Sequence, residues 1–148
     1  MRLTCCRRLQ FCIAHRVVGH EGECAHVHGH NYVVYVHAES REGLDDLGRV
    51  VDFSVLKMAV GGWIDHHWDH GVLLYEHDSI VGIWSKGGAL EGHKHYLLPH
   101  NPTAENIARF LIEDVCPVEL AGSGVDVFKV VVHETENCSA EATEVIDG

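Results

Sequence analysis

Residues 24–36, CAHVHGHNYVVYV, decide how this chain folds and where its chemistry lies. The half that follows Asn31 is rich in β-branched and aromatic residues, which is typical of a strand. In extended backbone, side chains two residues apart project from the same face, so His28 and His30 can direct their rings to one point. His15 ends another strand-like run. The sequence therefore predicts a site at which three imidazoles meet.

Three neutral imidazoles that leave a fourth position open are the ligand set of a catalytic zinc ion. His15, His28 and His30 are therefore the candidate metal ligands. The chain holds 14 histidines in 148 residues, so some pairs at this spacing arise by chance. The alternative is that these rings are exposed or packed in the core without a metal.

Cys24 lies four residues before His28. A thiol beside a divalent cation is biased toward thiolate, the form that acts as a base or a nucleophile. If Cys24 instead bound the metal as a fourth ligand, the site would be closed and structural. The residues by themselves leave both roles open.

Size and charge limit the function classes. A chain of 148 residues with 46% hydrophobic residues is expected to form one domain, residues 1–148, with a core that needs no disulfide. The formal charge of -11 argues against nucleic acid or an anionic membrane as a partner, because both require a positive surface. No signal peptide and no run of about 18 apolar residues is visible. We expect a soluble, cytoplasmic protein with a small-molecule or protein partner and reduced cysteines.

The pattern of polar and apolar residues indicates the fold class. Residues 2–15, 31–39 and 125–134 are strand-like, and a short strand can follow Asn137. The segment from Tyr75 to Leu98 has no readable period. Together with two helices, this order predicts an α+β domain, ββααββ, in which an antiparallel four-stranded sheet carries both helices on one face.

The two helices have recognisable ends. Ser54 can cap the first helix, which Gly61-Gly62 is expected to weaken at its end. Thr103 can cap the second helix, which Pro117 is expected to close.

The run IDHHWDHGVLL contains two candidate acid-base pairs, Asp65-His66 and Asp69-His70. Each places a carboxylate beside an imidazole whose charge it could stabilise. A solvated helix end is the alternative for both pairs, and spacing alone does not choose between them.

Two further carboxylates are candidates for ligand binding. Alternation places Glu134 on the face of Phe128, Val130 and Val132, at the end of an apolar row. A ligand with two N–H donors, such as the amino-pyrimidinone edge of a pterin or guanine, would satisfy both of its oxygens. An ordinary helix-cap or surface contact is the alternative for Glu134. Glu105 in the first turn of the second helix is explained by the helix dipole.

Six ordered segments of the chain resemble the 6-pyruvoyl-tetrahydropterin synthase and 6-carboxytetrahydropterin synthase family, specifically its bacterial branch in queuosine biosynthesis. They are residues 11–15, 24–32, 48–57, 68–74, 101–108 and 133–135. The resemblance implies a tunnelling fold (T-fold) and a homohexamer, a dimer of trimers whose active sites lie between subunits.

The resemblance also implies roles for individual residues. Zn²⁺ is bound by the three histidines, Cys24 is catalytic, and Asp69-His70, supplied by a neighbouring subunit, completes a triad. Glu134 anchors the pterin ring, and Glu105 is a weaker candidate for substrate binding. The first dyad, Asp65-His66, fits the family pattern less well because the leucine-rich step follows His70.

The reaction implied is the conversion of 7,8-dihydroneopterin triphosphate to 6-carboxytetrahydropterin, acetaldehyde and triphosphate. Phosphate contacts are unassigned; the candidates are Arg16, Lys57, Lys86 and Lys94. An unphosphorylated pterin substrate therefore stays open. Two alternatives remain, a 6-pyruvoyl-tetrahydropterin synthase or related pterin side-chain lyase, and a non-catalytic metal-binding protein.

Overall fold

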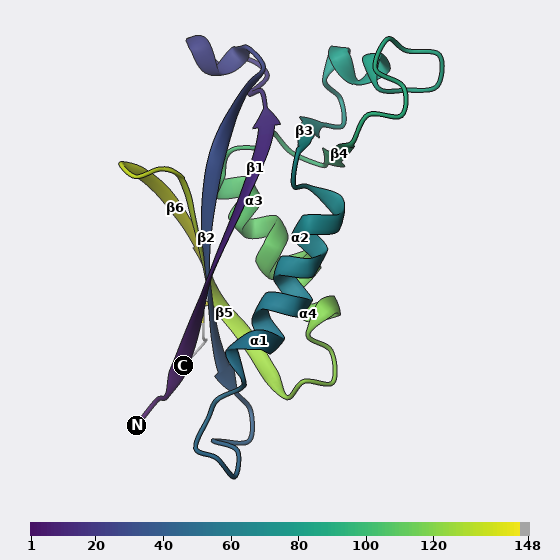
Figure 1. The fold of residues 1–148 in the computed structure, drawn as a ribbon. Coiled ribbons are helices and arrows are strands. Elements are labelled where there is room, and N and C mark those ends of the chain that lie inside the picture. Colours follow the sequence, from purple (N-terminus) through teal and green to yellow (C-terminus); the bar gives the residue numbers. More distant parts are fainter. Residues whose placement is uncertain (146–148) are drawn as a thin grey trace.

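The computed structural model describes residues 1–145, and one mixed sheet forms its frame (Figure 1). The strand order is β4-β3-β1-β2-β5-β6. Four strands pair antiparallel in the order β1-β2-β5-β6, while β3 and β4 are parallel to β1 and extend the sheet beyond its edge. The strands are β1 (Thr4–His15), β2 (His28–Ser40), β3 (Gly71–Tyr75), β4 (His95–Leu98), β5 (Val125–Thr135) and β6 (Cys138–Thr143).

The α+β class and the antiparallel four-stranded unit are confirmed, but the sheet has six strands rather than four. The two extra strands lie in the glycine- and histidine-rich part of the chain and are five and four residues long. The end of β1, from Ile13 to His15, offers an open edge of backbone groups, and Gly71 to Leu73 pair with it. This pairing depends on a tertiary edge, so local sequence periodicity does not reveal it.

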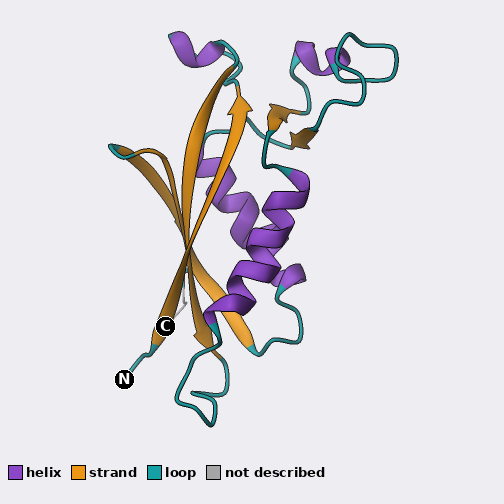
Figure 2. Ribbon diagram, in the orientation of Figure 1, coloured by secondary structure: helices purple, strands orange, loops and turns teal. Residues whose placement is uncertain are grey.

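Both helices cover the same face of the sheet (Figure 2). Each is a continuous helical run with a π-helical turn in its middle. The first consists of α1 (Phe53–Leu56), a π-helical turn (Lys57–Gly61) and α2 (Gly62–His67); the second consists of α3 (Ala104–Phe110), a π-helical turn (Leu111–Val115) and α4 (Cys116–Glu119).

Three details of the helices differ from the sequence expectation. Asp52, not Ser54, is the N-cap of α1, and its carboxylate accepts the Ser54 N–H. Gly61 lies inside the first helix, where a Cβ would come within 3.1 Å of the Leu9 side chain, so this glycine lets the helix approach β1. Pro117 does not close the helix: it lies in the first turn of α4, directly after the π-helical turn, and the helix continues to Glu119.

The core lies between the sheet and the helices. Alternate residues of β2, including Tyr32, Val34 and Val36, are fully buried. Phe11 of β1 stacks on Tyr32 with ring centroids 5.4 Å apart, and Trp68 packs beside Phe11. This packing fixes the ends of β1 and β2, which carry the candidate metal ligands.

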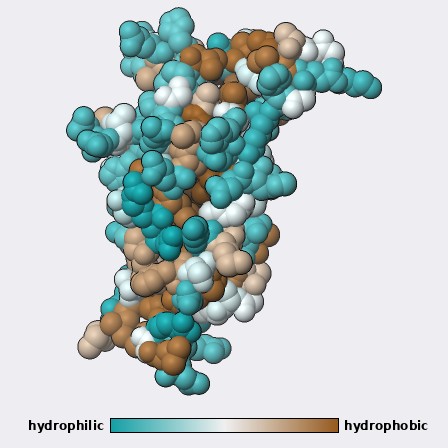
Figure 3. Space-filling view, viewed as in Figure 1, coloured by the Kyte–Doolittle hydropathy of each residue, from teal (hydrophilic) through white to brown (hydrophobic). Residues whose placement is uncertain are grey.

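The surface is mostly hydrophilic on the face shown in Figure 3, with apolar residues gathered toward the two ends of the molecule. In the described part of the chain, no helix combines the length and the hydrophobicity that crossing a membrane requires.

Candidate metal centre and active site

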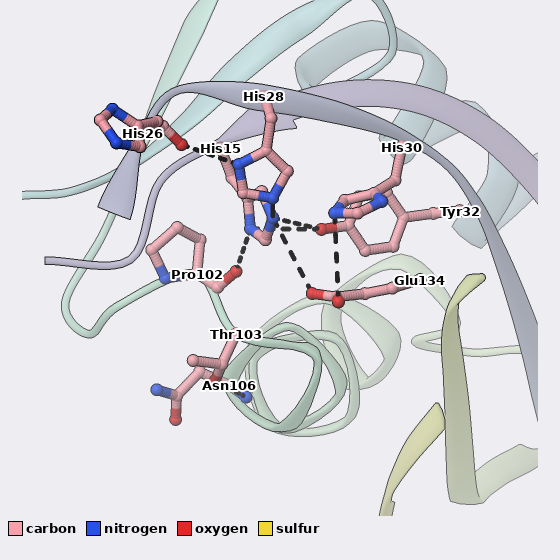
Figure 4. Close-up of polar contacts among 9 residues, drawn as sticks. All are labelled: His15, His26, His28, His30, Tyr32, Pro102, Thr103, Asn106 and Glu134. Carbon is pink, nitrogen blue, oxygen red and sulfur yellow. Dashed lines mark hydrogen bonds and ion pairs between the residues drawn. The ribbon is translucent and has the colours of Figure 1, made fainter. Parts of the chain in front are cut away.

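The last residue of β1 and the first residues of β2 bring three imidazoles together (Figure 4). In the antiparallel register His15 pairs with His28, and Ile13 pairs with His30. All three rings project to the helix-covered side, and their ligand nitrogens lie within 4.8 Å of one another. The predicted meeting point of the three imidazoles is therefore present in the fold, built by strand pairing.

Backbone carbonyls fix the tautomers of two rings. His15 donates its Nδ1 hydrogen to the Pro102 carbonyl at 2.6 Å, and His28 donates its Nδ1 hydrogen to the His26 carbonyl at 2.7 Å. Because a carbonyl oxygen can only accept, the Nε2 atom of each neutral ring keeps its lone pair. The two Nε2 atoms face each other at 3.0 Å. Two lone pairs at this separation require a proton or a cation between them.

Burial favours the neutral form of two of the three rings, His15 and His30. Desolvation, aided by the neighbouring His28 and His30 rings, lowers the pKa of His15 to about 4, against the opposing effect of the Pro102 hydrogen bond. The pKa of His30 is also lowered, mainly by desolvation. The Nε2 atom of His30 is buried without a hydrogen-bond partner in residues 1–145. The three imidazole nitrogens gathered here match the donor set that Zn²⁺ prefers.

Glu134 lies beside this cluster. Its carboxylate oxygens are 3.8 Å from His15 Nε2 and 4.0 Å from His30 Nε2, and its side chain is 26% exposed. The expected apolar row of β5 is correct for Val130 and Val132 but wrong for Phe128. A bulge in the β2–β5 pairing shifts the register there, and Phe128 packs against His37 and Arg2 instead.

Tyr32 is a member of the site that sequence reasoning missed. Its hydroxyl lies 3.2 Å from His15 Nδ1 and 3.4 Å from His15 Nε2. Desolvation, together with electrostatic repulsion from the neighbouring Glu134, raises the pKa of Tyr32 far above its usual value, so the hydroxyl stays protonated. Its place two residues after His30 on the same strand face was the available signal.

Cys24 sits in a short 3-10 turn, Glu23–Ala25, and is partly buried. Its carbonyl accepts a hydrogen bond from the Val17 N–H at 2.8 Å. Within residues 1–145, its sulfur is not part of the group of ligand atoms that lie within 4.8 Å of one another. This arrangement favours the open three-ligand set over a closed site with Cys24 as a fourth ligand.

The Asp69 carboxylate and the His70 ring lie against each other at the turn between α2 and β3. The Asp69 carboxylate accepts from the Cys12 N–H at 2.9 Å and lies 3.0 Å from His70 Nδ1. Burial opposes ionisation of Asp69, but these two hydrogen bonds and the His70 charge outweigh it and lower its pKa. Because Asp69 contacts the Nδ1 atom of His70, the Nε2 atom of His70 remains available for proton transfer. The His70 side chain is 79% exposed. The pair is not brought into the histidine cluster of its own chain.

The backbone around this pair is tightly determined. His70 has a positive φ of 65°, an unusual conformation for a residue with a side chain. At Gly71, a Cβ would lie 3.0 Å from the Trp68 carbonyl and 3.1 Å from the Lys94 carbonyl, so a side chain there would require the neighbouring backbone to shift. Lys94 donates to the carbonyls of Asp65 and Asp69 at 2.9 and 2.6 Å and thereby caps the end of α2.

Two of the four candidate phosphate contacts are engaged elsewhere. Lys94 holds the helix end just described, and Arg16 makes two hydrogen bonds of 2.6 Å to the fully buried carboxylate of Asp78. The side chains of Asp65 and His66 are exposed on α2 and form no ion pair with each other in the described chain.

The structure separates Glu105 from the other candidates. Glu105 is exposed in the first turn of α3 and lines a groove of about 540 Å³ against β6. His30 and Glu134 instead line a cleft of about 680 Å³, together with Asn31, Tyr35 and His133. This second cleft therefore borders one ring of the histidine cluster, His30, and the Glu134 carboxylate.

Comparison with known proteins shows which family the chain is similar to. The sequence profile of 6-pyruvoyl tetrahydropterin synthase matches residues 4–145. The 6-carboxy-5,6,7,8-tetrahydropterin synthases of Rickettsia bellii and Rickettsia felis are 37% and 36% identical over 139 residues, which cover 94% of this chain and 99% of each relative.

Solved structures share the fold. An uncharacterized protein from Wolinella succinogenes superimposes with a TM-score of 0.81 at 24% identity, over 98% of this chain and 99% of that one. The 6-pyruvoyl tetrahydropterin synthase of Caenorhabditis elegans does so with a TM-score of 0.65 at 24% identity, over the same shares. The T-fold expectation is confirmed, and the chain belongs to the 6-pyruvoyl tetrahydropterin synthase family.

Proposed function

We propose that this chain is a zinc-dependent 6-carboxy-5,6,7,8-tetrahydropterin synthase that acts in queuosine biosynthesis. Its substrates are 7,8-dihydroneopterin triphosphate and water, and its products are 6-carboxytetrahydropterin, acetaldehyde and triphosphate. Family membership supports a lyase that acts on a pterin side chain, and the names of the Rickettsia relatives support the carboxy-forming activity. The observation that carries the metal dependence is the pair of Nε2 lone pairs facing each other at 3.0 Å.

In this proposal His15, His28 and His30 hold the zinc ion. Bound there, Zn²⁺ supplies Lewis-acid polarisation of the substrate's side-chain hydroxyls. The carbonyls of Pro102 and His26 keep two of the ligands in the required tautomer. Tyr32 contributes a neutral hydroxyl beside His15.

The remaining residues bind the ring and move protons. Glu134 accepts two N–H groups of the pterin in charge-assisted hydrogen bonds, which sets the position of the ring in the cleft. Cys24 as thiolate exchanges a proton with a side-chain carbon, and His70 exchanges one with a side-chain oxygen. Asp69 stabilises the imidazolium that forms on His70.

The active site is proposed to form between subunits of a homohexamer. His70 is exposed and lies outside the histidine cluster of its own chain, so a second copy is needed to complete the site. Mixing Cys24→Ala with His70→Ala subunits tests this directly. Intersubunit sites predict that the two inactive variants regain about a quarter of the wild-type activity after subunit exchange. Sites within one chain predict no recovery.

Product analysis tests the reaction. Zinc-loaded protein incubated with 7,8-dihydroneopterin triphosphate should release acetaldehyde and a carboxylated pterin, both identified by mass spectrometry. A 6-pyruvoyl product would assign the chain to the sister activity. Absence of turnover, with several loosely bound metals per chain, would instead indicate a metal-binding protein.

A further inference from the structure

Few contacts hold the loop that carries Cys24. Residues 16–27 connect β1 to β2 and contain one short 3-10 turn. Within residues 1–145, three side chains from outside this range hydrogen-bond to the loop: Asp78 binds the Arg16 guanidinium, Asn101 binds the backbone of Val18, and His28 binds the carbonyl of His26. The position of the thiol therefore depends on a small number of groups.

The Asn101 amide binds Val18 at two points. Its Oδ1 accepts the Val18 N–H at 2.9 Å, and its Nδ2 donates to the Val18 carbonyl at 3.0 Å. A donor and an acceptor directed at one residue fix its orientation as well as its distance. Asn101 is itself held at the start of α3, because its carbonyl accepts from Thr103 N and from Asn106 Nδ2.

A second hydrogen bond connects this part of the loop to Cys24. Val17, the neighbour of Val18, donates its N–H to the Cys24 carbonyl at 2.8 Å. Pro102, the neighbour of Asn101, accepts the hydrogen bond from His15. The Asn101-Pro102 pair thus ties the thiol-bearing loop and one candidate metal ligand to the same helix N-terminus.

We propose that Asn101 is a positioning residue that fixes the Cys24 loop relative to the three-histidine cluster. The functional consequence rests on the proposed role of Cys24 in the reaction. Proton transfer requires the donor and acceptor in near-contact geometry, and a misplacement of about 1 Å can cost on the order of 100-fold in rate. Loss of the two hydrogen bonds between Asn101 and Val18 should therefore lower kcat, whereas binding of the pterin ring through Glu134 stays intact.

The test compares Asn101→Asp with Asn137→Asp. In Asn101→Asp, one carboxylate oxygen still accepts the Val18 N–H. The other oxygen replaces the amide donor and repels the Val18 carbonyl oxygen. The negative charge lies near the start of α3, where it does not destabilise the helix. Asn137 is exposed in the β5–β6 turn, and its side chain makes no hydrogen bond within residues 1–145, so it is the matched control. Asn101→Ala is made in parallel, because it removes both hydrogen bonds to Val18 and adds no charge.

Three measurements on zinc-loaded protein are decisive. Hydrogen exchange of the peptide covering residues 16–27 should quicken about fivefold to tenfold in the position-101 variants, while the exchange of β5 stays unchanged. Alkylation of the partly buried Cys24 by iodoacetamide should also quicken. The kcat should fall about 10- to 100-fold with KM within about twofold of wild type. The control should match wild type throughout.

The outcomes separate this proposal from the proposed function. Unchanged exchange and alkylation of the loop in both position-101 variants would overturn the positioning role, as would a uniform rise in exchange across the whole chain with loss of zinc. If no variant, including wild type, turns over the pterin substrate, but the loop still loosens as described, the positioning role stands and the assigned reaction fails.

Discussion

Acidifying the metal-free protein should remove about 3 kcal/mol of stability through His15 alone. This ring is 1% exposed, and burial lowers its pKa from 6.5 to about 4. The difference of about 2.5, at about 1.36 kcal/mol for each pKa unit, gives the expected magnitude. As the pH falls below 6.5, His15 becomes protonated in the unfolded chain but stays neutral in the folded chain. The stability is therefore complete above pH 6.5 and is lost progressively down to about pH 4.

Urea unfolding of chelator-treated protein between pH 7 and pH 4, followed by tryptophan fluorescence, measures this effect. His15→Asn cannot titrate and is the reference. The pKa values of His30, His37 and His67 are also lowered, but these residues are common to both proteins, so the difference between the two curves isolates His15. The difference in free energy of unfolding between wild type and His15→Asn should change by about 3 kcal/mol on acidification, to the disadvantage of wild type. Parallel curves would refute the buried, neutral state of His15 on which the metal site depends.

Three further perturbations follow from the structure. His30→Ala removes one of three nitrogen ligands, so metal analysis of the purified variant should find clearly less zinc per chain than in wild type; equal zinc would contradict its role as a ligand. Cys24→Ala should retain its zinc and lose about 100- to 10,000-fold in kcat, the usual contribution of a proton-transfer group, as measured by acetaldehyde release; full activity would exclude the thiol from the reaction. Trp68→Ala leaves a cavity beside Phe11 in the core and should lower the free energy of unfolding by about 3–5 kcal/mol in urea titrations; a loss below about 1 kcal/mol would show that this packing is misjudged.

Much of the candidate site could be predicted from local patterns. The spacing of His28 and His30 follows from the two-residue period of a strand, and His15 closes the preceding strand, so antiparallel pairing of the two places all three rings on one face. Capping of the second helix by Thr103 was likewise correct, since a threonine hydroxyl accepts the N–H three residues on.

Other features depend on contacts between distant segments. The β3 and β4 strands form because the end of β1 offers an open edge, and the β5 bulge that turns Phe128 away from Glu134 exists only in the pairing with β2. The roles of Tyr32, Asn101 and Pro102 arise in the same way, because each contacts a residue that lies at least 17 positions away.

The sequence by itself determined the fold class, the family and the identity of the three imidazoles, because periodicity and motif spacing are local properties of the chain. Only the tertiary structure decided that His15 is neutral, that a carbonyl from the start of α3 sets its tautomer, and that His70 is exposed and lies outside its own cluster. Burial, hydrogen-bond partners and direction are properties of the packed chain, and they convert three histidines at suitable spacing into a site that can hold a metal ion.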